Sequence, residues 1–273
     1  MRDFLGFGVV GNFAFHLEQA GEANTFALVK TTCDNAPKGI FPFYVPNAHN
    51  FLSNDCFDNN YLIMPEKTLV QAEPEVALRC ELEYDEDGKV KDIKVKSFMA
   101  FNDASIRRDT TAIKVSQKKN FSNASKGFGN EILIDKFDSN GICQNFSIVS
   151  FLKNQNGFFR YGECAKLSEY NYFYSTLIEW MKVTFNTQKD YTVLEDLLSI
   201  TKQSGYIKEA IISVGATRYE KAYESYFLNH ADEISIVVFN HNKYSLELIE
   251  SFVQNDTQIP DKSDISILKQ VIK

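Results

Sequence analysis

Two long runs of alternating side chains in the first half of the chain constrain the fold more than any other feature. Residues Glu75–Tyr84 and Lys89–Phe101 both have the composition and the two-residue period of β-strands. Between them stands Asp85-Glu86-Asp87-Gly88, and Asp-Gly between two such runs is a strong signal for a tight antiparallel turn. The sequence therefore predicts a long β-hairpin in this region.

A second hairpin and two helices are predicted further along the chain. The hairpin joins Phe146–Leu152 to Phe158–Tyr161 across Asn156-Gly157, which is a preferred pair for tight turns. Apolar residues at helical spacing predict a first helix that Ser168 can cap and a second helix over Tyr191–Lys202. Helices are thus expected in the middle of the chain, after the hairpins.

Strands return near the end of the chain, at Ile207–Val214 and Glu233–Phe239. Hairpins first, then helices, then strands again predict an α+β fold rich in antiparallel sheet. We expect one main domain over residues 1–250 and a C-terminal tail over residues 251–273, which is polar from Asn255 onward and has a short amphipathic piece at Ile265–Ile272. Residues 1–65 are rich in Gly, Pro, Asn and Asp, and this composition predicts loops or lids that carry function.

Charge and cysteine content narrow the partners and the compartment. The formal net charge is −7 and no long basic run is present, so we expect neither nucleic acid nor an anionic membrane as a partner. The five cysteines are odd in number and form no C-x-x-C pair, which indicates free thiols in a reducing compartment. No signal peptide and no run of ~20 apolar residues is recognised, so a cytoplasmic protein is expected.

Two glutamates at the start of the first long strand form the first candidate site. Glu73 and Glu75 are separated by one residue, so both carboxylates project from the same face of a strand, about 7 Å apart at the backbone. Pro74 between them cannot donate to a ladder and places the segment at a strand start or edge. Asp103 follows the partner strand, which returns it beside the first strand. The three carboxylates suit Mg²⁺, Mn²⁺ or Ca²⁺, unless they are solvated surface acids.

Three basic side chains could act beside such a site. His16, with Glu18 and Glu22 close by in the sequence, is a candidate general base or else a packed loop histidine. Lys126 lies in a Gly-rich turn where its ammonium could hold an anionic substrate, although a lysine near glycine is usually solvated. Arg107 could clamp a carboxylate or could be an ordinary surface residue.

Taken in order, these motifs resemble the fumarylacetoacetate hydrolase superfamily. Its members carry Gly-x-Asn-Tyr-x-x-His-x-x-Glu, then Glu-x-Glu on a strand, Asn-Asp-x-Ser-x-Arg-Asp, a Lys-Ser-Phe-Asp-like segment and a late Thr-Gly-Thr-Pro turn. The resemblance spans roughly residues 6–245. The counterparts in this chain are Gly11-Asn12-Phe13-Ala14-Phe15-His16, Glu73-Pro74-Glu75, Asn102-Asp103-Ala104-Ser105-Ile106-Arg107, Lys126-Gly127-Phe128-Gly129 and Gly215-Ala216-Thr217.

The resemblance implies which residues would carry the chemistry. It places the ligands of a divalent metal, Mg²⁺ or Mn²⁺ with Ca²⁺ as an alternative, at Glu73, Glu75 and Asp103. The catalytic groups would be His16, Glu18 and Lys126. Substrate binding would fall to Asn12, Arg107 and Thr217, and Arg218 could add a carboxylate clamp that the family site lacks or could be a surface residue.

A fold and a reaction are implied as well. The fold would be a mixed β-sheet roll with peripheral helices, usually assembled as a homodimer. The reaction would be hydrolytic or lyase cleavage of a C–C bond in a small acylpyruvate-like keto acid or β-diketo acid, through a metal-stabilised enolate. Related decarboxylases and isomerases would need mainly the same electron sink.

Three departures from the family pattern keep a second hypothesis open. Gln19 stands where the family has a glutamate, Gly129 where it has an aspartate, and Arg218 follows a changed Thr-Gly-Thr-Pro turn. A weakened His–Glu pair would disfavour water activation, which favours a pseudoenzyme or a small-molecule or protein binding module on the same fold. A purely partner-binding protein that uses residues 1–65 is the third hypothesis.

Overall fold

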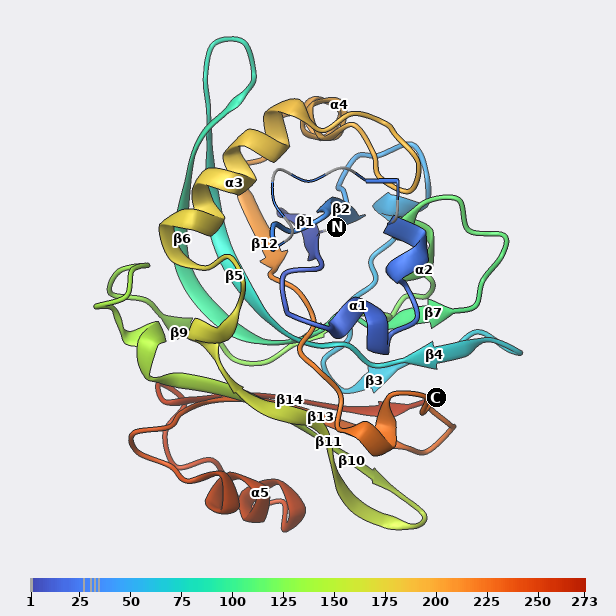
Figure 1. Cartoon of the computed structure of the whole chain (residues 1–273), viewed down its shortest axis with the longest axis vertical. Helices are drawn as coiled ribbons and strands as arrows, with labels where there is room; N and C mark the ends of the chain where they lie inside the picture. Colours follow the sequence, from blue (N-terminus) through green and yellow to red (C-terminus); the bar gives the residue numbers. More distant parts are fainter. Residues whose placement is uncertain (1, 27, 30, 32, 34) are drawn as a thin grey trace.

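Two β-sheets and a short ribbon make up the framework of the computed structural model, which describes residues 2–26, 28–29, 31, 33 and 35–273. Figure 1 shows the sheets as the upper and lower parts of the molecule. The first sheet has the order β2 (Gly39–Tyr44), β1 (Leu5–Val10), β12 (Glu209–Ser213), β5 (Pro74–Tyr84), β6 (Val90–Asn102) and β8 (Gly127–Phe128), with β9 (Ile132–Leu133) also on β6. The second has the order β11 (Gly157–Lys166), β10 (Phe146–Asn154), β13 (Glu233–Asn240), β14 (Ile265–Ile272) and β3 (Tyr61–Leu62).

The remaining elements are short or peripheral. A two-stranded ribbon pairs β4 (Leu69–Gln71) with β7 (Ser105–Arg107). The described α-helices are α1 (His16–Gln19), α2 (Val115–Lys119), α3 (Tyr174–Thr187), α4 (Leu197–Gln203) and α5 (Leu246–Gln254). Mixed sheets with a few helices on the outside are the architecture expected from the sequence, so the predicted fold class is confirmed.

The first predicted hairpin is the longest paired unit of the first sheet. Strands β5 and β6 are antiparallel, and Pro74 pairs with Asn102 at the end that is remote from the turn. Pro74 is the first residue of β5, as its missing N–H requires. One residue beyond this pair, the Asp103 amide donates to the Glu73 carbonyl at 3.0 Å. The hairpin register therefore sets the end of β6 against the start of β5.

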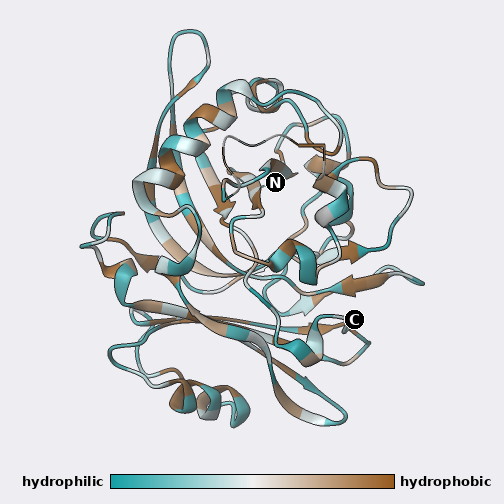
Figure 2. Ribbon diagram, in the orientation of Figure 1, coloured by the Kyte–Doolittle hydropathy of each residue, from teal (hydrophilic) through white to brown (hydrophobic). Residues whose placement is uncertain are grey.

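Both faces of the first sheet are buried over much of its area. Strand β1 is buried along its whole length: Leu5 and Phe7 belong to the main core, whereas Val10 packs into a second cluster with Phe43 and Phe101. Two-sided burial explains why β1 is continuously apolar instead of alternating. Figure 2 shows apolar residues along the strands and a hydrophilic tip on the β5–β6 hairpin.

The two sheets meet through aromatic contacts, and α5 covers the outer face of the second sheet. The rings of Phe98 on β6 and Phe146 on β10 pack edge to face with centroids 4.9 Å apart. On the other side of the second sheet, Ile249 and Val253 of α5 join the cluster of Val149 and Phe151. The second sheet is thus also apolar on both faces.

Several element boundaries differ from the sequence-based prediction. Helix α4 begins at Leu197 and not near Tyr191, because the Asp196 side chain accepts from the Ser199 amide and so caps the helix there. Helix α3 begins at Tyr174, whereas Ser168 lies in a separate 3-10 turn, so the predicted cap at Ser168 is wrong.

Two regions read as loop or tail contain strands of the sheets. Residues 1–65 contribute β1, β2 and β3, and the part of this prediction that concerns residues 1, 27, 30, 32 and 34 lies outside the described residues. Residues 251–273 contain β14, which pairs with β13 and β3 in the second sheet. The domain division at residue 250 stays a prediction. Among the described residues, no helix is both long and apolar enough to span a membrane.

The contact between the sheets leads to a first prediction. Phe98 is fully buried, so Phe98→Ala should lower the free energy of unfolding by about 3–5 kcal/mol, the usual cost of removing a core phenyl ring. Val183→Ala on the exposed face of α3, where Val183 is 60% exposed, is the control and should change it by less than about 0.5 kcal/mol. Urea denaturation measures both, and equal losses would show that the sheets do not depend on this contact.

Candidate functional site

The predicted carboxylates converge where β5 begins and β6 ends. One oxygen from each of Glu73, Glu75 and Asp103 lies within 4.8 Å of the others. All three side chains are buried, with exposed fractions of 6%, 2% and 1%. They are therefore not solvated surface acids, and the β5–β6 register explains how residues about 30 positions apart in the sequence meet. Three buried carboxylates carry a large desolvation cost unless cations accompany them.

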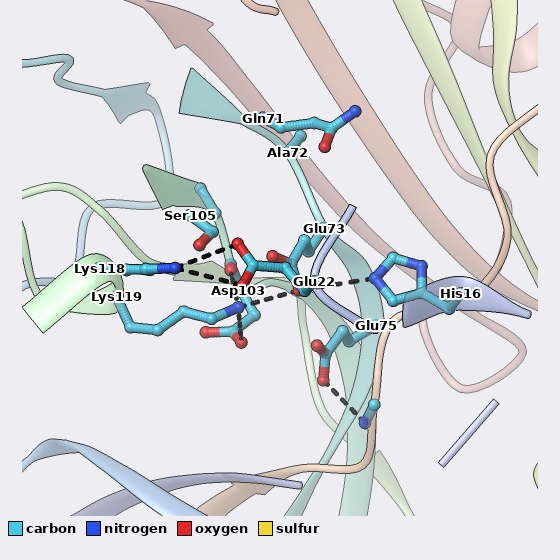
Figure 3. Close-up of polar contacts among 12 residues, drawn as sticks. His16, Glu22, Gln71, Ala72, Glu73, Glu75, Asp103, Ser105, Lys118 and Lys119 are labelled. Carbon is cyan, nitrogen blue, oxygen red and sulfur yellow. Dashed lines mark hydrogen bonds and ion pairs between the residues drawn. The ribbon is translucent and has the colours of Figure 1, made fainter. Parts of the chain in front are cut away.

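Three buried cations compensate this negative charge. Arg107 Nη2 lies 2.9 Å from Glu73 Oε1, and Lys126 Nζ lies 3.1 Å from Asp103 Oδ1. Lys119 Nζ lies between two of the acids, 2.9 Å from Glu73 Oε2 and 2.6 Å from Asp103 Oδ2. Figure 3 shows the Lys119 side chain reaching across from α2 to this position.

The two glutamates have opposite electrostatic environments. Burial alone would raise the pKa of Glu73, but the Lys119 ammonium and the Arg107 guanidinium more than offset it and lower the pKa to about 2. Burial raises the pKa of Glu75 well above its usual range, and the neighbouring Asp103 charge adds to the effect. Glu75 Oε2 accepts one hydrogen bond, from the Gly215 amide at 2.9 Å. Glu73 is thus ionised without a metal, whereas Glu75 favours the neutral acid.

His16 is the buried imidazole of the site and is held in one orientation. Its Nδ1 is 2.9 Å from the Thr217 carbonyl, which can only accept, so Nδ1 carries the proton and Nε2 has the free lone pair. Nε2 lies 3.9 Å from Glu73 Oε2. Burial is the main cause that lowers the pKa of His16 to about 4, so the ring is neutral at neutral pH.

A cavity lies beside this cluster. Its volume of about 40 Å³ has room for a few water molecules, and His16, Glu73, Glu75, Asp103 and Lys119 line it. A larger recess of about 270 Å³ adjoins it and shares Ala20, Glu22, Arg107 and Lys118 with it. Glu22 stands where the two meet and pairs with Lys118 at 3.2 Å and Arg107 at 3.6 Å. Figure 3 shows the Glu22–Lys118 pair beside the acidic cluster.

Several residues that the resemblance singled out lie away from the cavity lining. Lys126 is fully buried beneath Asp103, where its ammonium also donates to the carbonyls of Ala104 and Lys119 at 2.8 Å. Glu18 is exposed on α1. Arg218 pairs with Glu163 at 2.6 Å.

Two further residues of that set, Asn12 and Thr217, connect loop segments through hydrogen bonds. The Asn12 amide donates to the carbonyls of Tyr172 and Val214 at 2.9 Å, and its oxygen accepts from the Tyr172 amide. The Thr217 hydroxyl donates to the Pro74 carbonyl at 3.3 Å, and the Thr217 carbonyl accepts the hydrogen bond from His16 Nδ1.

The departure at Gln19 also has a structural role. Its amide nitrogen donates to the Tyr219 carbonyl at 3.2 Å and to Glu224 at 2.9 Å, while its oxygen accepts from the Tyr219 amide. Both ends of the side chain thus tie α1 to the segment after β12. No hydrogen bond joins the side chains of Gln19 and His16 among the described residues, and the only hydrogen bond of the imidazole within that set is the one to Thr217.

Sequence reasoning missed Lys119, which is the most central cation. In the sequence, Lys118 and Lys119 look like an ordinary surface pair. A signal was nevertheless present: Val115 and Lys119 are four residues apart, so a helix here puts them on the same face, and both are buried on α2.

Comparisons with known proteins agree with this picture of the fold. Residues 22–272 match a family described as a family of unknown function, DUF5718. No curated protein sequence matches the chain significantly. A 2-keto-3-deoxy-D-arabinonate dehydratase complexed with magnesium and 2,5-dioxopentanoate has a similar structure, with a TM-score of 0.53 and 14% identity over 98% of this chain and 72% of that one.

Two further solved structures are similar. A 5-carboxymethyl-2-hydroxymuconate delta-isomerase from Mycobacterium smegmatis has a TM-score of 0.53 and 14% identity, covering 98% of this chain and 78% of that one. A protein assigned to the fumarylacetoacetate hydrolase family from Yersinia pestis CO92 has a TM-score of 0.50 and 13% identity, covering 87% and 91%. At such identities the likeness concerns the fold.

The opposite environments of the two glutamates lead to a second prediction. In metal-stripped protein at pH 7, Glu73→Gln should lower the free energy of unfolding by about 3–5 kcal/mol, because it leaves Lys119 and Arg107 with less negative charge in a buried site. Glu75→Gln should cost about 1 kcal/mol or less, since the amide oxygen can still accept from Gly215. Urea denaturation compares the two variants, and a larger loss for Glu75→Gln would contradict this assignment of charge.

Proposed function

The chain belongs to the family of unknown function DUF5718 and has the fumarylacetoacetate hydrolase fold, and we propose that it is a divalent-metal-dependent enzyme acting on a small keto acid. The proposed reaction is hydrolytic or lyase cleavage of a C–C bond in an acylpyruvate-like keto acid or β-diketo acid. The observation that carries the proposal is the buried carboxylate cluster beside a cavity that also holds a neutral, oriented imidazole.

The donor set fits a hard divalent cation. Glu73, Glu75 and Asp103 offer oxygen atoms within 4.8 Å of one another, and these three residues would hold the ion. Oxygen-only ligands favour Mg²⁺ or Mn²⁺, with Ca²⁺ as an alternative. A bound ion would supply Lewis-acid stabilisation of the enolate that develops when the C–C bond breaks.

The neutral His16 imidazole is the proposed base. His16 lines the cavity, and its Nε2 lies 3.9 Å from Glu73 Oε2. Nε2 can take a proton from water, and the resulting hydroxide attacks the ketone carbon of the substrate. The electron pair of the breaking C–C bond passes to the enolate. The proton on Nε2 then returns to the enolate carbon, which leaves His16 neutral again.

Basic side chains at the junction of the two cavities are suited to the anionic end of the substrate. Arg107 and Lys118 line both cavities and are now paired with Glu22, so a substrate carboxylate could take the place of that side chain. Lys126 acts as a positioning residue for Asp103 in this proposal, because it contacts Asp103 and does not reach the cavity.

A second candidate function is a pseudoenzyme or small-molecule binding module on the same fold. Two observations favour it: Gln19, at the position of the family glutamate, ties α1 to Tyr219, and the Lys119 ammonium lies between Glu73 and Asp103. In that case the cavity would bind an anion without converting it. The titration proposed below separates the two functions.

We also propose that the protein forms a homodimer and is located in the cytoplasm. The five cysteines are all free thiols, and those at Cys33 and Cys164 are exposed, which suits a reducing compartment.

A calorimetric titration of Mn²⁺ into metal-stripped protein tests the metal site. The wild type should bind about one ion per chain, oxalate should tighten the binding because it mimics a chelating enolpyruvate, and Glu75→Ala should abolish it. Glu83→Ala, on the same strand but partly exposed, is the matched control and should leave binding unchanged. If the folded wild type binds no ion at millimolar Mn²⁺, the metal-dependent enzyme is excluded and the binding module remains.

Turnover of a panel of acylpyruvates and 2-keto acids tests His16. His16→Asn should lower kcat by about 10²–10⁴-fold, the usual contribution of a general base, while Mn²⁺ affinity stays within about threefold of the wild type. Because the neutral imidazole is the active form, kcat/KM of the wild type should rise as pH increases through about 4 and then stay flat through pH 6.5. An unchanged kcat in the variant would remove His16 from the mechanism.

A further inference from the structure

We propose that Lys119 is a built-in cation that competes with the divalent ion, so that metal binds only when it displaces the Lys119 ammonium from between Glu73 and Asp103. Lys119 would then set the metal concentration at which the site fills. The inference rests on the proposed metal site and goes beyond it, because neither the fold nor the motif pattern assigns a role to this residue.

The contacts of Lys119 are those of a fully coordinated cation. Its Nζ lies 2.6 Å from Asp103 Oδ2, 2.9 Å from Glu73 Oε2 and 2.9 Å from the Asp103 carbonyl oxygen. An ammonium has three N–H donors, so these three acceptors use all of them. The side chain is 7% exposed, and the centroid of the Phe41 ring lies 5.4 Å from Nζ. Lys119 is therefore held in place and is not a flexible surface lysine.

An ion and the ammonium cannot share this position. Mg²⁺ binds oxygen at about 2.0–2.1 Å, and Lys119 already contacts one oxygen of Glu73 and one of Asp103, which are two of the three proposed ligands. Two cations on the same oxygen pair would repel each other strongly in a buried site. The Lys119 side chain lines the 40 Å³ cavity, which gives the displaced ammonium a path away from the carboxylates.

The charge balance supports the same conclusion. Each of the three buried cations, Lys119, Lys126 and Arg107, pairs with Glu73 or Asp103, and none of them pairs with Glu75 in the part of the chain that the structure describes. The other two cations do not occupy the space between the acids: Lys126 lies beneath Asp103 and Arg107 contacts the outer oxygen of Glu73. Lys119 is thus the cation whose displacement would both free ligand oxygens and remove positive charge.

Competition of this kind predicts a gain of metal affinity when Lys119 is neutralised. In a calorimetric titration of metal-stripped protein, Lys119→Met should bind Mn²⁺ about 10- to 100-fold more tightly than the wild type, because no buried ion pair has to be broken. Lys119→Gln, which keeps an N–H donor for Asp103, should show the same direction and serves if the Met variant does not fold. Lys119→Arg keeps the competing charge and should bind Mn²⁺ no more tightly than the wild type.

Lys94→Met is the matched control. Lys94 lies on β6, the strand that leads to Asp103, has the same charge and pairs with Glu83 and not with the proposed ligands. Its replacement should change Mn²⁺ affinity by less than about threefold, since it is exposed and contacts none of the three carboxylates. An equal gain in Lys94→Met and Lys119→Met would show a general effect of charge and would overturn the proposal of a competing cation.

The outcomes separate this inference from the proposed function. If the wild type and both neutral variants bind Mn²⁺ with equal affinity, the metal site stands and the competition is wrong. If only the neutral variants of Lys119 bind, the competition is supported, and the wild type is a metal-independent protein with a lysine in the cation position. If none of the folded proteins binds, both the metal site and the competition are overturned.

Discussion

The structure of the site depends on the register of one hairpin. Pairing of Pro74 with Asn102 brings Asp103 beside Glu73, where the Asp103 amide donates to the Glu73 carbonyl, and Glu75 follows two residues further along the same strand. A slip of one residue would turn every side chain to the other face of the sheet and would separate the three carboxylates. The alternating half of β5 opposes this slip, because the slip would turn Glu81 and Glu83 toward the apolar face that Cys80 and Leu82 now occupy.

Charge compensation is the second constraint. Three carboxylates in a dry environment are tolerated only because Lys119, Lys126 and Arg107 come from three other segments to meet them. The same arrangement lowers the pKa of Glu73 and leaves His16 neutral, which are the states required of a metal ligand and of a base. Folding and the proposed chemistry therefore depend on one cluster of charges.

Features that depend on neighbouring residues could be predicted from the sequence, whereas features that depend on contacts with distant segments could not. The β5–β6 hairpin and the pair Glu73 and Glu75 follow from a turn signal and a strand period, both confined to neighbouring residues. The β14 strand was read as part of a tail because a short amphipathic segment acquires its structure only from the sheet it joins. Lys119 was missed for a similar reason: its partners lie 16 or more residues away, and no motif marks them.

Anomalous diffraction from a crystal soaked with Mn²⁺ tests the central claim most directly, since it locates the ion without assuming its ligands. The account predicts one strong peak within coordination distance of Glu73, Glu75 and Asp103, with the Lys119 ammonium moved away from Glu73 and Asp103. A crystal in which the cluster holds no peak at saturating Mn²⁺, and Lys119 still bridges the two acids, would contradict it.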